Sequence, residues 1–179
     1  MKRLSTLLVL LLFAITHAQD DQKTSGLFYK VSFSATLTNN EDYTIGNDND
    51  ESLINLNGLF LNNTIGYQFD TRSSIGLNVE YDHFLDQHLN FLPIYLDFTY
   101  NLFDFDDQIF IRGGYGKLLD LGENFENGSL YKMGLGIRVY DNNFKNSGLI
   151  GFDFSRRRFG FREEDTLSSF AIFIEFMLF

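Results

Sequence analysis

Residues 131–139 read Tyr-Lys-Met-Gly-Leu-Gly-Ile-Arg-Val, so that large apolar side chains alternate with small or charged ones. The apolar set is Tyr131, Met133, Leu135, Ile137 and Val139, and the opposing set is Lys132, Gly134, Gly136 and Arg138. Successive side chains of a β-strand point to opposite faces, so this period of two predicts a strand with two different faces. One face carries bulky apolar side chains, and the other carries glycines and charged side chains.

Seven further stretches show the same alternation, and turn-forming residues separate them. They cover residues 27–37, 56–69, 75–82, 91–102, 109–116, 150–157 and 170–179. Short polar breaks at 70–73, 104–107 and 141–146 take turns with longer connections at 38–52, 84–89, 118–128 and 156–167. Short turns at one end and long loops at the other are typical of an antiparallel meander that closes into a barrel. The sequence therefore predicts an all-β, closed, antiparallel up-and-down β-barrel of eight strands, with both chain ends on the short-turn side.

The sizes of the side chains predict which face points outward. Eight strands leave only enough interior space for side chains to fill. The polar face carries mostly Gly, Ser, Thr and Asn, whereas the apolar face carries Phe, Tyr, Leu and Ile. We therefore expect a transmembrane barrel whose apolar rows face lipid, because lipid requires a closed sheet with paired backbone groups. Two interfacial aromatic belts are expected, one of Phe69, Phe103, Tyr140 and Phe144 and one of Tyr81, Phe91, Phe159 and Phe161.

The beginning of the chain is typical of a cleaved export signal. Met1-Lys2-Arg3 precedes an apolar run over residues 7–15, and the small-residue exit Thr16-His17-Ala18 follows. The run is too short to cross a bilayer as a helix, which takes ~20 apolar residues. We expect a signal peptide at residues 1–18 and a single barrel domain at residues 19–179. The precursor charge of −10 becomes −12 without Lys2 and Arg3, and so acidic a chain is a poor match for nucleic acid.

Three segments of the mature chain resemble a known family. They are Phe-Leu-Pro-Ile-Tyr-Leu-Asp at residues 91–97, Arg-Gly-Gly-Tyr-Gly-Lys at residues 112–117, and the terminal Phe179 after an alternating strand. The whole mature chain resembles the small outer-membrane β-barrels of Bacteroidota-type bacteria, which are similar to OmpX-like and OmpA-like barrels. This resemblance implies a bacterial outer-membrane location with periplasmic termini, and contact with membrane lipids and lipopolysaccharide. It also implies that Phe179 is the signal read by the barrel-assembly machinery.

The expected interior face carries as many positive as negative charges. The positive residues are Lys30, Arg112, Lys132, Arg138 and Arg157, and the negative residues are Glu80, Asp82, Asp97, Asp153 and Glu175. Charges removed from water are costly unless they are paired, so this balance predicts an ion-pair network that fills the lumen. We expect Asp97 and Arg112 to lie close together on neighbouring strands. The alternative is a path for protons or ions through the same groups.

Side chains that would support catalysis or metal binding are sparse. Outside the export signal the chain has two histidines, His83 and His88, and neither has a serine at a strand spacing suited to a nucleophile–base pair. The acidic segment at residues 47–51 offers oxygen ligands for calcium but lacks the glycine of an EF-hand loop. We therefore expect no enzyme activity, no cofactor and no metal site.

These observations favour a non-enzymatic outer-membrane barrel with a role in envelope integrity or in contacts with an extracellular or envelope partner. Two alternatives remain open from the sequence. One is a small pore for ions or solutes, and the other is a soluble periplasmic barrel that binds an apolar ligand. The soluble alternative requires the apolar rows to face inward around a cavity.

Overall fold

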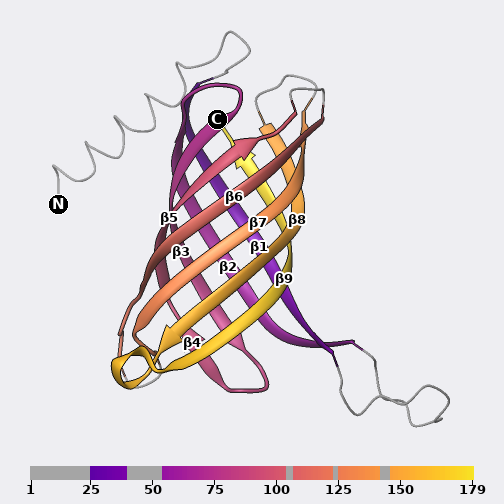
Figure 1. The fold of residues 1–179 in the computed structure, drawn as a ribbon. Helices are drawn as coiled ribbons and strands as arrows, with labels where there is room; N and C mark the ends of the chain where they lie inside the picture. Colours follow the sequence, from indigo (N-terminus) through magenta and orange to yellow (C-terminus); the bar gives the residue numbers. More distant parts are fainter. Residues whose placement is uncertain (1–24, 40–53, 104–106, 123–124, 142–145) are drawn as a thin grey trace, which may run out of the picture.

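The computed structural model describes residues 25–39, 54–103, 107–122, 125–141 and 146–179. The predicted export signal, the acidic segment at residues 47–51 and Phe144 lie outside these residues. Within them, no helix has the length and apolar character needed to span a membrane. Almost every described residue belongs to a strand or to the connection between two strands (Figure 1).

The predicted alternating stretches form the strands of one sheet. The strands are β1 (Gly26–Asn39), β2 (Ile54–Gln68), β3 (Ser73–Phe84), β4 (Leu89–Phe91), β5 (Pro93–Asn101), β6 (Asp107–Leu118), β7 (Gly128–Tyr140), β8 (Asn146–Phe159) and β9 (Asp165–Leu178). The predicted fourth stretch is divided at Leu92 into the short β4 and the longer β5. Both β4 and β5 pair with β3 in the same register, so β4 continues the line of β5 at one end of the barrel. The barrel wall therefore has eight long strands, as predicted.

The sheet closes on itself without a free edge. Around the wall the long strands follow the order β2-β1-β9-β8-β7-β6-β5-β3, and β3 also pairs with β2. Every pairing in this circuit is antiparallel, and the first strand meets the last through the ladder from Tyr29 opposite Leu178 to Thr36 opposite Ala171. This is the closed, antiparallel, up-and-down all-β barrel that the sequence predicts (Figure 1).

The apolar rows face outward. Met133 is 69% exposed, Leu27 67% and Ile65 66%, and apolar residues one pleat apart along the same strands are exposed in the same way. The residues between them on each strand are buried inside. A soluble barrel with an apolar ligand cavity needs the opposite orientation of these rows. The exterior is therefore a continuous apolar wall, and the polar residues point into the lumen.

The two ends of the barrel differ. The start of β1 and the end of β9 lie at the end that carries the connections β2–β3, β5–β6 and β7–β8, which we call the short-turn end (Figure 1). We call the other end the loop end. The prediction of a long connection there at residues 156–167 is wrong. Strand β8 continues to Phe159 and pairs with β9 from Asp165, which leaves only residues 160–164 as the connection. Three consecutive arginines at 156–158 are a sequence typical of a loop. In the structure they belong to the strand, with Arg157 pointing into the lumen and Arg156 and Arg158 pointing outward.

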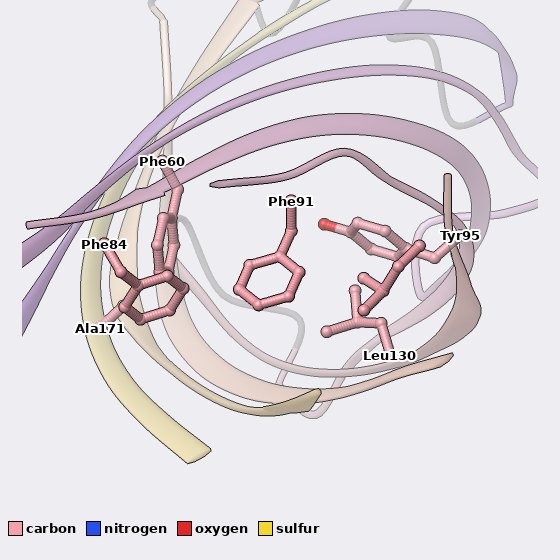
Figure 2. Close-up of a cluster of buried hydrophobic side chains, with 7 residues drawn as sticks. Phe60, Phe84, Phe91, Tyr95, Leu130 and Ala171 are labelled. Carbon is pink, nitrogen blue, oxygen red and sulfur yellow. The ribbon is translucent and has the colours of Figure 1, made fainter. Parts of the chain in front are cut away.

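Two apolar clusters occupy the interior, one toward each end. The loop-end cluster comprises Phe60, Phe84, Phe91, Tyr95, Leu118, Leu130 and Ala171 (Figure 2). The short-turn cluster comprises Phe28, Phe110, Leu149, Phe173 and Met177. In the loop-end cluster, the ring centroid of Phe84 lies 5.1 Å from the ring centroid of Phe60 and 5.9 Å from that of Phe91, which are normal distances for aromatic pairs. The lumen therefore has an apolar cluster toward each end, and most of its charged side chains lie between the two clusters.

The predicted aromatic belt at the loop end is wrong for two of its members. Phe91 is fully buried inside the barrel, and Phe159 packs against it with a centroid distance of 5.2 Å. Tyr81 and Phe161 are exposed as expected, and Phe69 and Phe103 are exposed at the short-turn end. Phe91 points inward because it continues the inward row of Tyr95 and Asp97, and the pairing with β3 keeps one register from β4 to β5.

Candidate functional site: the filled lumen

The structure places all ten predicted interior charges inside the barrel. Nine of them belong to one connected set of ion pairs, whereas Arg138 forms no ion pair within the described residues. The acids and bases come from β1, β3, β5, β6, β7, β8 and β9, so the pairs join strands across the lumen as well as around the wall. We call this set the lumen network.

The loop-end part of the lumen network is built around Arg157 of β8. Its Nε donates a hydrogen bond of 2.8 Å to Oδ2 of Asp82, and its Nη2 donates to the same oxygen. Nη2 also lies 3.7 Å from Oε1 of Glu80. Its Nη1 donates to the hydroxyl of Ser155 at 2.8 Å and to that of Ser169 at 3.1 Å. All three guanidinium nitrogens therefore have partners, which is the condition for burying a charge without a large penalty.

The same guanidinium also touches the loop-end apolar cluster. The carbon Cζ of Arg157 lies 4.8 Å from the ring centroid of Phe60, 5.0 Å from that of Phe84 and 5.8 Å from that of Phe91. Arginine stacks well on aromatic faces because its charge is delocalised over a plane. Arg157 therefore connects the charged layer to the aromatic layer above it.

The centre of the lumen network surrounds Arg112 of β6. Its Nη2 lies 2.6 Å from Oδ2 of Asp153 and its Nη1 lies 3.1 Å from Oε2 of Glu175. Lys30 of β1 lies 3.2 Å from the other oxygen of Glu175 and 3.8 Å from Asp97. Arg112 and Asp97 are on neighbouring strands one pairing step apart, as predicted, because Thr99 is opposite Arg112 and Asp97 is opposite Gly114. However, each of them has its ion pairs with other residues.

Lys132 of β7 joins the two parts of the lumen network. Its Nζ lies 2.6 Å from Oε2 of Glu80 and 3.3 Å from Oδ2 of Asp153. Because Glu80 contacts Arg157 and Asp153 contacts Arg112, one continuous chain of charges crosses the barrel.

Arg138 departs from the predicted network. Its Nε donates to the hydroxyl of Ser147 at 2.9 Å and its Nη1 donates to the side-chain oxygen of Gln68 at 3.2 Å. Its Cζ also lies 4.5 Å from the ring of Tyr140 and 5.7 Å from that of Phe179. Within the described residues Arg138 therefore forms no ion pair, and its hydrogen-bond partners are neutral.

Neutral polar side chains that the sequence did not single out complete the network. The Tyr95 hydroxyl donates to Oε2 of Glu80 at 2.9 Å, and the amide of Asn78 donates to Oδ1 of Asp97 at 2.6 Å. Asn62 in turn donates to the side-chain oxygen of Asn78 at 2.9 Å and to the Tyr95 hydroxyl at 3.2 Å. The alternation of each strand places these three side chains on the inward face, which is the sequence signal that they belong to the lumen. Their bond partners depend on the stagger between strands.

Interior glycines provide the space for the long charged side chains. A Cβ atom added to Gly134 would lie 2.1 Å from Oδ1 of Asp153 and 3.1 Å from Cγ of Arg112. A Cβ atom at Gly76 would lie 2.4 Å from Oδ1 of Asp97. The two distances to the aspartates are overlaps rather than contacts, so the glycines allow each aspartate to lie flat over the neighbouring strand. A small pocket beside Asn78 and Arg112 has a volume of about 10 Å³, roughly the space of one water molecule.

The remaining predicted residues lie outside the lumen network. His83 is half-buried, and its Nδ1 is 2.8 Å from the side-chain oxygen of Asn90. His88 is exposed in the β3–β4 turn. Phe179 is half-buried, and its ring packs at 6.1 Å from that of Phe28 at the short-turn end. No group of three or more His, Cys, Asp or Glu side chains suited to hold a metal ion occurs in the part of the chain that the structure describes.

No protein family matches this chain, and no curated protein sequence does. A chain from a structure described as the de novo design of transmembrane beta-barrels is similar in fold, with 12% identity and a TM-score of 0.45 over 89% of this chain and 100% of that chain.

Proposed function

We propose that this protein is a bacterial outer-membrane β-barrel that does not conduct, and that it acts as a structural element of the envelope or as a carrier of surface contacts. The lumen network carries the proposal. Its nine charged side chains are all ion-paired and lie between two apolar clusters, which fits a filled barrel better than a channel.

The exterior supports the membrane part of this proposal. On β7 the exposed side chains are apolar from Tyr131 to Val139, and on β9 they are apolar from Phe170 to Leu178. A transmembrane strand needs about 9–11 residues when it is tilted. In water an apolar surface of this extent would drive association, whereas in lipid it is the favourable surface.

The interior supports the non-conducting part. Eight-stranded barrels leave room only for side chains, and here that room holds long charged residues in mutual contact. A conducting pore needs an open path with mobile water between its two ends. The aromatic rings of Phe60, Phe84 and Phe91 lie across the loop end of the lumen (Figure 2). No catalytic set is proposed, because neither histidine belongs to a nucleophile–base pair among the described residues.

Planar-bilayer recording tests this function. The purified protein, folded and inserted as shown by heat-modifiable gel migration, is expected to give no stable conductance above that of the bilayer. A matched variant that shortens three lumen side chains, F91A/K132A/R157A, is expected to give measurable current. Large, stable openings of the unchanged protein would refute the filled-lumen proposal and favour a small pore.

A further inference from the structure

Charged side chains are nearly absent from the outward faces of the barrel strands. Among the strand residues whose side chains the structure describes, only three outward-facing residues carry a charge, and all three are positive: Lys117 of β6, and Arg156 and Arg158 of β8. They lie within the last rungs before the loop end. In a chain with a net charge of −10, such a grouping of cations on one side is unexpected.

The register brings these residues onto adjoining rungs. Lys117 is opposite Ser129, and Ser129 is opposite Arg158, which forms an upper rung across β6, β7 and β8. One pleat lower, Tyr131 is opposite both Tyr115 and Arg156, and the two tyrosine rings are 4.9 Å apart. We call Lys117, Arg156 and Arg158 the basic tier. The aromatic pair of Tyr115 and Tyr131 lies beside Arg156 on the same outer face.

An apolar groove lies directly below this tier. The next outward rung runs from Gly113 through Met133 and Phe154 to Phe170. These residues line a groove of about 580 Å³ in the outer wall. Gly113 makes the groove deeper, because a Cβ atom at that position would meet no atom within 4 Å. An outward glycine in the middle of an apolar row leaves a notch of the width of a side chain.

The charges of the tier are only partly neutralised by the protein. Lys117 lies 3.7 Å from Glu163 of the β8–β9 connection, and Glu163 also accepts a hydrogen bond of 2.8 Å from Ser129. Arg156 and Arg158 form no ion pair with any residue in the described ranges. Both are exposed, and their neighbours on β9 are the neutral Ser168 and Thr166.

We propose that this surface binds one lipid with an anionic phosphate headgroup. Arg156 and Arg158 contact the phosphate, since a guanidinium matches phosphate oxygens with paired hydrogen bonds. An acyl chain lies in the groove at Gly113, four residues below Lys117 on the same strand and so about 13 Å away at the rise of a strand. This spacing is that of a headgroup and the upper part of its acyl chain. The inference rests on the proposed membrane location.

A lipid fits this surface better than a protein partner or a free phosphate ion does. The basic tier and the apolar groove are continuous on one face, so an occupant needs a charged end and an apolar tail. Inorganic phosphate would use only the tier. Lipid always surrounds a transmembrane wall, so a lipid reaches this surface without a separate binding partner being supplied.

Native mass spectrometry of the detergent-purified protein tests the site, with phosphatidylglycerol as the anionic probe and phosphatidylcholine as the neutral one. The unchanged protein is expected to retain phosphatidylglycerol in preference, and R156Q/R158Q is expected to lower that preference by about tenfold. R156K/R158K, which keeps the charge but loses the paired geometry, is expected to fall between them. R72Q removes a cation at the short-turn end and serves as the matched control, with no change expected.

The groove is tested separately by G113F, which is expected to reduce retention of both lipids while leaving the charge preference. Phosphate at millimolar concentration is expected not to displace the lipid, and displacement would overturn the proposal. Equal retention of both lipids by a correctly folded barrel, or no effect of R156Q/R158Q, would also overturn it. Heat-modifiable migration and insertion into vesicles are measured on the same samples, so that failure to insert counts against the membrane proposal and not against the site alone.

Discussion

Arg157 and Asp82 are 75 positions apart in the chain and meet inside the barrel, where Nε of the arginine donates to Oδ2 of the aspartate at 2.8 Å. Both side chains are fully buried. Strands β8 and β3 are not neighbours in the wall, so this pair spans the lumen rather than a ladder. It links the two sides of the barrel immediately below the aromatic rings of the loop-end cluster.

Replacing Arg157 by methionine is expected to destabilise the barrel by about 3–5 kcal/mol, because Asp82 is left as a buried charge without its main partner. The double variant R157M/D82N removes that charge as well and is expected to be more stable than R157M. Urea unfolding in lipid vesicles, followed by gel migration, measures both. Additive effects of the two substitutions would contradict the coupling inferred from the geometry.

Gly134 and Gly113 provide a matched pair on opposite faces of the wall. Valine at Gly134 would overlap Asp153 and displace its contact with Arg112, with an expected loss of about 1–3 kcal/mol. Valine at Gly113 enters open space on the exterior and is expected to leave stability unchanged or slightly raised. The same unfolding assay compares them. Equal losses would show that glycine is needed for strand geometry rather than for the lumen network.

The wall and its orientation could be predicted from sequence because they depend on local alternation and on side-chain size. The row from Tyr131 to Val139 contains both signals, and the structure confirms strand and outward face. The inward position of Lys132, Arg112 and Arg157 follows from the same alternation. These features do not depend on which strand lies across the barrel.

Pairing across the lumen could not be predicted in the same way. Arg138 and Arg112 both alternate inward, yet only Arg112 reaches carboxylates, because the stagger of the strands sets the height of each side chain. Phe91 differs from Arg138, because its inward position follows the alternation of Tyr95 and Asp97, whereas the predicted aromatic belt was inferred from residue type and from nearness to a strand end. The rings that fill the two ends of the lumen are large apolar residues on the face that the alternation assigns to small and polar ones.

Asp70 at the β2–β3 turn is expected to titrate below the usual range of an aspartate. The Ser73 hydroxyl donates to its Oδ1 at 2.8 Å, and the backbone amides of Arg72 and Ser73 donate at 2.8 and 2.7 Å. These bonds favour the carboxylate and lower its pKa from 3.8. The resulting stabilisation of the turn is present above the unfolded pKa and is lost as the pH falls through the folded one. Carboxyl-carbon NMR in micelles measures this pKa, with S73A as the variant expected to raise it toward 3.8. A value in the unchanged protein at or above 3.8 would contradict the role of the three bonds.

A charge placed on the outer wall distinguishes a membrane barrel from a soluble one. Leu135 is 56% exposed in the middle of β7, between Ile111 and Phe152 on the neighbouring strands. Leu121 is 60% exposed beyond the end of β6. If lipid covers the wall, L135R is expected to cost about 2–4 kcal/mol in vesicles, whereas L121R, near the interface, is expected to cost about 0–1 kcal/mol. If water covers the wall, the two substitutions should be equally mild, because an exposed leucine that becomes arginine in water loses little. Unfolding of both variants in vesicles therefore tests the membrane assignment through residues that contact neither the lumen network nor the basic tier.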